Sequence, residues 1–146
     1  MATIEIKLVI DRPVEEVFAF VSNSENLPRW RSSSLEVKKT SEGPFGVGST
    51  FKSRFTFLGR QFDSEVVVTA HEPNRVYMSK MAEGPFPLET RYLLEAVGNG
   101  THVTFVAEGE PGGFFKLAEP LVVSMAKRAF TTDLQNLKEM LEAQAV

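Results

Sequence analysis

Two side chains stand out as candidates for chemistry, Tyr92 and Asp133. Tyr92 falls within an alternating apolar segment typical of a strand, and Asp133 falls within the apolar stripe of a helical segment. A buried carboxylate can have a raised pKa and act as a general acid or base, and a tyrosine hydroxyl can donate a hydrogen bond to a ligand.

Each candidate also has a structural interpretation. Tyr92 can be a core residue whose hydroxyl lies at the rim of the core. Asp133 can lie at the edge of the stripe and pair with a cation such as Arg29 or Arg31. Structural ion pairs are commoner than active sites, which favours the structural role for Asp133.

Other residue types argue against several classes of enzyme. His71 and His102 are isolated and lack a neighbouring carboxylate cluster, so no metal site is expected. The chain has no cysteine, and no serine has a plausible histidine partner for a nucleophilic triad. We therefore expect no metal and no cofactor, and the sequence leaves open whether the protein is an enzyme.

The composition is that of an ordinary globular protein. The chain has 146 residues and a formal net charge of -3, which predicts a single domain over residues 1–146 and no nucleic-acid partner. No segment approaches the ~18 apolar residues that a membrane span requires. The alternating N-terminus predicts a strand instead of a signal peptide, so we expect a cytoplasmic protein, either a monomer or a homodimer.

The spacing of the apolar residues predicts the helices and strands that position Tyr92 and Asp133. Residues 4–10 alternate and predict a strand, and residues 13–21 and 24–30 predict two short helices. Six further strands are expected between residues 35 and 108, with turns at residues 71–74 and at Asn99-Gly100. From Phe114 onward the period is 3.6, which predicts one long helix that Pro120 either kinks or begins.

This order of elements predicts an α+β fold. Antiparallel hairpins would form one curved sheet with a single apolar face. The long helix would cover that face, and the two short helices would close one end of it.

The sequence resembles the START-like helix-grip superfamily, also called SRPBCC, and within it the polyketide cyclase/dehydrase branch. The matching segments are residues 11–18, 25–30, 46–49, 100–104 and 133–138. The resemblance implies a curved antiparallel sheet of about seven strands wrapped around a long C-terminal helix, two short helices after the first strand, and an internal hydrophobic cavity. Relatives bind lipids, sterols or polyketides, and some are enzymes while many are carriers or sensors, so the fold alone does not give the reaction.

The alternation of the strands assigns side chains to the inner face of the sheet. That face bears large apolar residues and no charged residue, and its polar groups are the hydroxyls of Ser53, Ser64, Thr90, Thr101 and Tyr92. The strand from Arg75 is ambiguous, because either Met78 and Lys80 or Tyr77, Ser79 and Met81 face inward. The predicted ligand-binding residues are Leu27, Trp30, Phe51, Ser53, Phe55, Phe62, Ser64, Val66, Met78, Phe86, Leu88, Thr90, Tyr92, Phe105, Met125, Ala129, Phe130 and Asp133.

Three hypotheses for function follow. The uncharged inner face favours binding of a hydrophobic small molecule (a lipid, polyketide or sterol-like compound) by a carrier or sensor, in a cavity that phenylalanine side chains could reduce to a few hundred Å³. The alternative is a polyketide cyclase/dehydratase-like enzyme in which Tyr92 donates a hydrogen bond and Asp133 is the acid or base. A third possibility is a protein-binding surface, for which Phe45, Phe86 and Phe114 could cluster at one rim.

Overall fold

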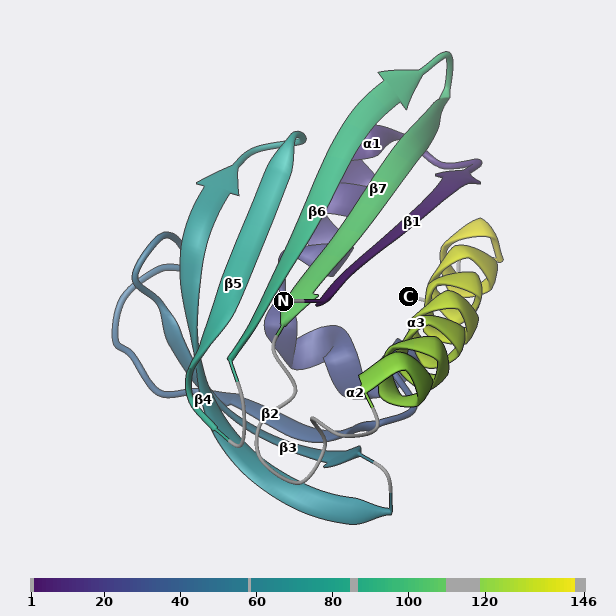
Figure 1. Ribbon diagram of the computed structural model, residues 1–146. Helices are drawn as coiled ribbons and strands as arrows, with labels where there is room; N and C mark the ends of the chain where they lie inside the picture. The colour runs from purple at the N-terminus through teal and green to yellow at the C-terminus, as the bar shows by residue number, and fades with distance from the viewer. Residues whose placement is uncertain (1, 58, 85–86, 110–118, 144–146) are drawn as a thin grey trace.

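The computed structural model describes residues 2–57, 59–84, 87–109 and 119–143 (Figure 1). Two short helices and a 3₁₀ turn follow the first strand, six strands come next, and one long helix ends the described chain. The elements are β1 (Ala2–Ile10), α1 (Val14–Val21), η1 (Ser24–Asn26), α2 (Leu27–Trp30), β2 (Ser34–Lys39), β3 (Thr50–Phe57), β4 (Arg60–Glu72), β5 (Val76–Glu83), β6 (Leu88–Val97), β7 (Gly100–Gly109) and α3 (Glu119–Glu142).

The strands form one antiparallel sheet in the order β1-β7-β6-β5-β4-β3-β2. The sheet is strongly curved, and β4, which is 13 residues long, spans the bend between β3 and β5 (Figure 1). α3 packs beside β1, and α2 packs between β2 and α3. The predicted α+β helix-grip architecture is therefore confirmed.

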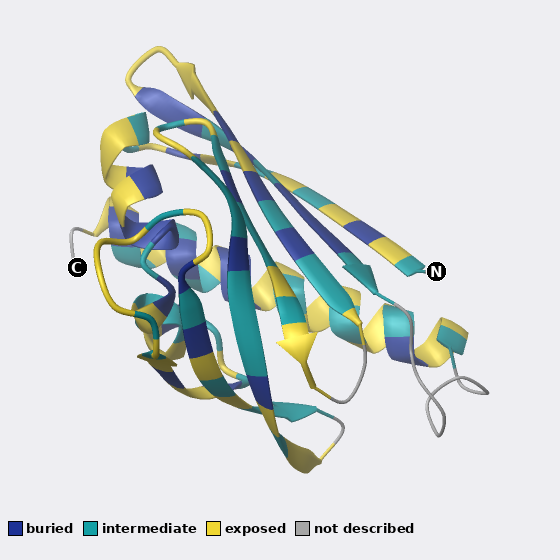
Figure 2. Ribbon diagram, turned by 90° about the vertical axis from the view of Figure 1, so that its left-hand side faces the viewer, coloured by how far each residue is buried: buried dark blue, intermediate teal, exposed yellow. Residues whose placement is uncertain are grey.

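The register between strands decides which side chains share the inner face. Ser53 lies opposite Ser64 on β3 and β4, and Ser79 lies opposite Thr90 on β5 and β6. Buried and exposed residues alternate along the strands (Figure 2). On β5 this alternation buries Tyr77 and leaves the side chain of Lys80 exposed, which resolves the ambiguity that the sequence left for this strand.

The two halves of α3 have different surroundings. Leu134, Leu137 and Leu141 in the C-terminal half are almost fully buried in the hydrophobic core. Ile10 of β1 and Val103 of β7 belong to the same core, and so do Val17 and Phe18 of α1. The C-terminal half therefore anchors the helix to the sheet, and the N-terminal half is left to line a cavity.

Two turns differ from their predicted positions. The hairpin between β6 and β7 turns at Gly98 and Asn99, one residue before the predicted Asn99-Gly100, and only Gly98 of the two has a positive φ (60°). A two-residue loop with glycine first is typical of a type II′ turn, whereas the Asn-Gly signal favours type I′. His71 and Glu72 were predicted in a turn but end β4, and the turn places Asn74 at φ 63°.

Pro120 is the second described residue of α3. The predicted helical segment from Phe114 to residue 118 lies outside the described residues. No helix within the described ranges is long and apolar enough to cross a membrane.

Candidate functional site: a cavity between the sheet and α3

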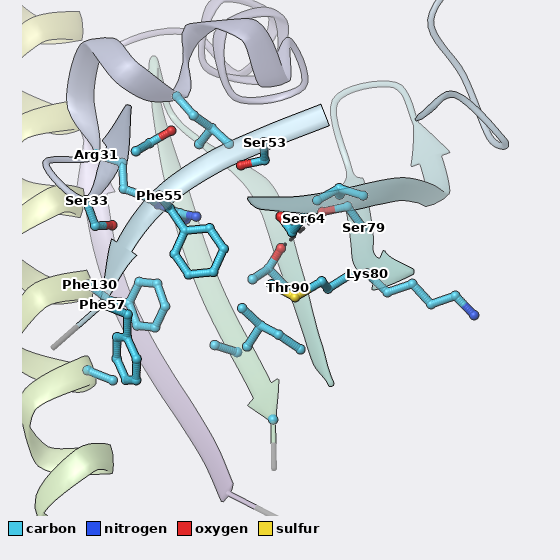
Figure 3. A pocket seen from close by; sticks show the side chains of 18 of the residues that line it. Arg31, Ser33, Ser53, Phe55, Phe57, Ser64, Ser79, Lys80, Thr90 and Phe130 are labelled. Atoms are coloured by element: carbon cyan, nitrogen blue, oxygen red, sulfur yellow. Dashed lines mark hydrogen bonds between the residues drawn. The ribbon is translucent and has the colours of Figure 1, made fainter. Parts of the chain in front are cut away.

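A cavity of about 200 Å³ lies between the inner face of the sheet and the N-terminal half of α3. α3 contributes Val122, Ala126 and Phe130 to its wall. The rings of Phe55, Phe57 and Phe130 lie along one side of it (Figure 3). Most of the lining is apolar, which suits a hydrophobic ligand.

Many of the predicted ligand-binding residues meet at this cavity. Those that line it are Leu27, Phe51, Ser53, Phe55, Ser64, Val66, Leu88, Thr90, Tyr92 and Phe130. They come from the short helix α2, from strands of the sheet, and from α3, so the alternation of the strands was a good guide to the lining.

Other predicted residues do not line the cavity. Trp30 and Phe105 are buried in the core, and Met78 lies on the opposite face of β5 from the lining residue Tyr77. Met125 and Ala129 are exposed, because the inward stripe of α3 runs through Val122, Ala126 and Phe130 instead.

Two further predicted residues lie elsewhere. Phe62 packs against Phe55, its partner across β3 and β4, with ring centroids 5.6 Å apart, but it does not reach the cavity. Phe86 lies outside the described residues, as does Phe114 of the suggested aromatic rim. Phe45, the third member of that rim, stacks on Phe51 at 5.7 Å.

Arg31 is the main lining residue that sequence reasoning missed as a ligand contact. It follows α2 directly, and its guanidinium lies over the rings of Trp30, Phe105 and Phe130 at 5.2, 5.9 and 5.3 Å from their centroids. Its Nη2 donates a hydrogen bond of 2.9 Å to the hydroxyl oxygen of Tyr92. A cation therefore forms part of a mostly apolar wall.

Tyr92 is buried, and burial is the main reason that its pKa is raised above the usual value. The nearby charge of Asp133 raises this pKa further, whereas Arg31 acts in the opposite direction. The net shift keeps the phenol neutral at physiological pH. A neutral hydroxyl that accepts from Arg31 still has its own proton to donate, so Tyr92 is suited to be a hydrogen-bond donor and not a base.

Asp133 is 1% exposed and does not line the cavity. Its Oδ1 accepts hydrogen bonds from the backbone N–H and the hydroxyl of Ser32, both at 3.1 Å. Its partner is thus Ser32, and no ion pair joins it to Arg31 among the described residues. Asp133 ties the segment after α2 to α3, which is the structural role that the sequence favoured with a different partner.

Hydroxyl groups form a second polar region of the wall. Ser79 and Thr90 lie within hydrogen-bond distance at 3.2 Å, and Ser64 lies close to them (Figure 3). The hydroxyl of Ser64 is buried and has no hydrogen-bond partner among the described residues. Ser24 and Tyr77 share a hydrogen bond of 2.5 Å, and burial raises the pKa of Tyr77 to about 12.

The described lining contains no aspartate, glutamate or histidine. Lys80 is its second cation, but its side chain points away from the cavity (Figure 3). In the part of the chain that the structure describes, no cluster of His, Asp and Glu side chains could hold a metal ion. The described part of the wall therefore offers hydrogen-bond donors and apolar surface.

Comparison of the sequence with known protein families identifies the family of this chain. The family described as "Polyketide cyclase / dehydrase and lipid transport" matches residues 1–142. The chain belongs to this family. A search of curated proteins found no match to the sequence.

Solved structures with the same fold include a START superfamily protein and an aromatase/cyclase. A protein of Thermus thermophilus is 17% identical, with a TM-score of 0.85, 99% of this chain and 100% of the other being covered. The Zhui aromatase/cyclase from Streptomyces sp. R1128 is 13% identical, with a TM-score of 0.79 and coverage of 99% and 96%. A START superfamily protein from Mycobacterium smegmatis is 17% identical, with a TM-score of 0.72 and coverage of 97% and 95%.

These identities are low, so the likeness shows a shared fold and not a shared reaction. Together with the match to the polyketide cyclase / dehydrase and lipid transport family, it confirms the START-like identification made from the sequence.

Proposed function

We propose that the protein binds a hydrophobic small molecule in the cavity between the sheet and α3, as a carrier or sensor. The observation that carries this proposal is the chemistry of the wall. Its surface is mostly apolar, it has hydrogen-bond donors, and its described residues include no carboxylate or imidazole that could move a proton.

The size of the cavity supports a small ligand. Its volume of about 200 Å³ is below the ~300–1,000 Å³ of typical ligand sites. Part of the space enclosed by the curved sheet is filled by the side chains of Phe51, Phe55 and Phe57. We therefore expect a single slender chain or a small ring system.

A cyclase-like activity is the second candidate, and one observation favours it. Arg31 and Tyr92 present two hydrogen-bond donors at one place on the wall, where they could stabilise negative charge that develops on a carbonyl oxygen. Such an enzyme would work mainly by positioning its substrate. The proton acceptor for a cyclisation would have to be the substrate itself or water.

Native mass spectrometry of the purified protein, followed by organic extraction, tests the proposal. A bound apolar molecule that exchanges unchanged with added analogues supports a carrier or sensor. A molecule that is released in altered form supports the cyclase-like alternative.

A pair of α3 variants tests whether the cavity is the site. Ala126 lines the cavity, while Ala129, three residues later, is exposed. Ala126→Phe should fill the cavity and weaken binding of the neutral fluorophore N-phenylnaphthylamine by about tenfold or more, or 1.4 kcal/mol. Ala129→Phe is the matched control and should bind the fluorophore like the wild type. Equal binding by both variants would contradict the proposal, provided that circular dichroism shows both to be folded.

A further inference from the structure

The guanidinium of Arg31 is an unusual group for the wall of an apolar cavity. It lies over three aromatic rings, and its one hydrogen bond to a described side chain goes to the neutral phenol of Tyr92. No carboxylate of the described chain lies within 4 Å of it. Arg31 is partly buried, and a partly desolvated charge with no carboxylate in direct contact is costly, which ring faces and one phenol offset only in part.

The donors of Arg31 are not all used. Its Nε is buried and has no hydrogen-bond partner among the described residues, and only Nη2 donates to Tyr92. A guanidinium has five N–H donors in a planar fork that fits a carboxylate through two parallel hydrogen bonds. The terminal nitrogens of Arg31, of which Nη2 donates to Tyr92, are thus suited to an anionic oxygen group.

The segment after α2 brings further donors to the same cavity. The backbone N–H of Ser34 donates to the carbonyl of Arg31 at 3.0 Å, so the two residues lie in one turn. Ser33 and Ser34 line the cavity together with Arg31, whereas Ser32 faces α3 and is held by Asp133. The hydroxyl of Ser34 is buried, the residue being only 8% exposed, and it has no hydrogen-bond partner in the described ranges.

We propose that the ligand of this cavity is an apolar molecule with an acidic oxygen group, a carboxylate or an ionised enol, and that Arg31 binds this group with help from Tyr92 and Ser34. This inference rests on the proposed function, because it names the chemical class of the ligand for the same cavity. Asp133 is then a positioning residue: through Ser32 it holds the turn that presents Arg31 and Ser34.

The proposal is tested with ligands that differ only in the head group. Decanoate, decanol and decylamine share one apolar chain, and each is measured by displacement of N-phenylnaphthylamine at about pH 8, where the carboxylic acid is ionised. We expect the wild type to bind decanoate about tenfold or more tighter than decanol, and decylamine most weakly. Equal affinity for decanoate and decanol would overturn the proposal and leave the proposed function intact, whereas no binding of any of them or of the fluorophore would count against the function itself.

Variants of Arg31 identify the group that is responsible. Arg31→Met keeps an apolar stem and removes the charge, so it should abolish the preference for decanoate while decanol still binds. Arg31→Lys keeps the charge without the fork and should retain part of the preference. Lys80→Met is the matched control, since Lys80 is the second cation of the lining and its side chain points away from the cavity. A preference that survives in Arg31→Met, or that is lost in Lys80→Met, would overturn the assignment to Arg31.

The two sources of an acidic oxygen are separated with an apolar β-diketone of the same chain length. If Arg31 binds an ionised enol, the bound diketone should ionise at a lower pH than the free diketone, which its ultraviolet absorbance reports. Arg31→Met should then remove this shift. If Arg31 binds only a carboxylate, decanoate should bind and the diketone should ionise at the same pH with and without the protein.

Discussion

Arg31 Nη2 lies 2.9 Å from the hydroxyl oxygen of Tyr92, although the two residues are 61 positions apart in the sequence. One belongs to the turn after α2 and the other to β6. Their hydrogen bond joins the short helices to the middle of the sheet at the wall of the cavity, so the site depends on the docking of the segment after α2.

The coupling between these two residues is measurable. Tyr92→Phe removes the acceptor and leaves another donor of Arg31 unpaired, which should lower the free energy of unfolding by about 1–2 kcal/mol. A double-mutant cycle with Arg31→Met measures the coupling by urea denaturation. The double variant should lose about 1 kcal/mol less free energy of unfolding than the sum of the losses in the two single variants. Additive effects would mean that the hydrogen bond contributes no stability in solution.

The two tyrosines of the chain provide a pH test. Burial raises the pKa of Tyr77 to about 12 and also raises that of Tyr92, whereas a tyrosine in the unfolded chain has a pKa of about 10. Above pH 10 the unfolded chain releases these protons while the native protein retains them. The contribution of the two tyrosines to the free energy of unfolding is therefore fully present below pH 10, and it is lost as the pH rises from about 10 through about 12.

Tyrosinate absorbance checks this prediction, because Tyr77 and Tyr92 are the only tyrosines in the sequence. The native protein should show little tyrosinate at pH 10, and the protein in concentrated urea should be about half ionised there. Similar titration curves in both conditions would show that the hydroxyls are accessible to water, contrary to the burial described.

The role of Asp133 can be tested by separating its shape from its charge. Asp133→Asn keeps an oxygen that can accept from Ser32, so ligand binding should change little. Asp133→Ala leaves the donors of Ser32 without a partner and should lower the free energy of unfolding by about 1–3 kcal/mol, with weaker binding of decanoate because Arg31 is less well held. Ser32→Ala removes only the hydroxyl bond and should have a smaller effect. If Asp133→Asn abolished turnover of an identified substrate while binding persisted, Asp133 would be an acid or base instead of a positioning residue.

A glycine pair tests the hairpin turn between β6 and β7. Gly98 has a φ of 60°, which costs an L-residue about 1–2 kcal/mol, so Gly98→Ala should lower the free energy of unfolding by about that amount. Gly46 has no positive φ and has open space around its Cα, so Gly46→Ala is the control and should be close to neutral. Equal effects of the two changes would show that the turn does not require the conformation of Gly98.

The sequence predicted the parts of this structure that depend on local periodicity. Alternation assigned Ser53, Ser64 and Thr90 to the inner face, because a strand places every second side chain on one side. The 3.6-residue period of α3 identified Phe130 as inward but also included Ala129, which lies at the margin of the stripe and is exposed.

The residues that the sequence did not place depend on tertiary contacts. Arg31 follows a helix of only four residues, and a segment so short has no period from which to infer the direction of its side chain. The partner of Asp133 is Ser32, which is 101 positions away, and no local pattern indicates such a pair. The only signal in the sequence is the run Arg31-Ser32-Ser33-Ser34, which is unusually rich in donors for a segment between a helix and a strand.

The most direct test of the central claim is an NMR titration of the protein with decanoate, following the backbone amide resonances. Binding in the cavity predicts shifts that centre on Arg31, Ser34, Ser64 and Tyr92, and their loss in Ala126→Phe. Shifts confined to the charged outer surface around Lys38, Lys52 and Arg54, or shifts unaffected by Ala126→Phe, would contradict the claim that this cavity is the site.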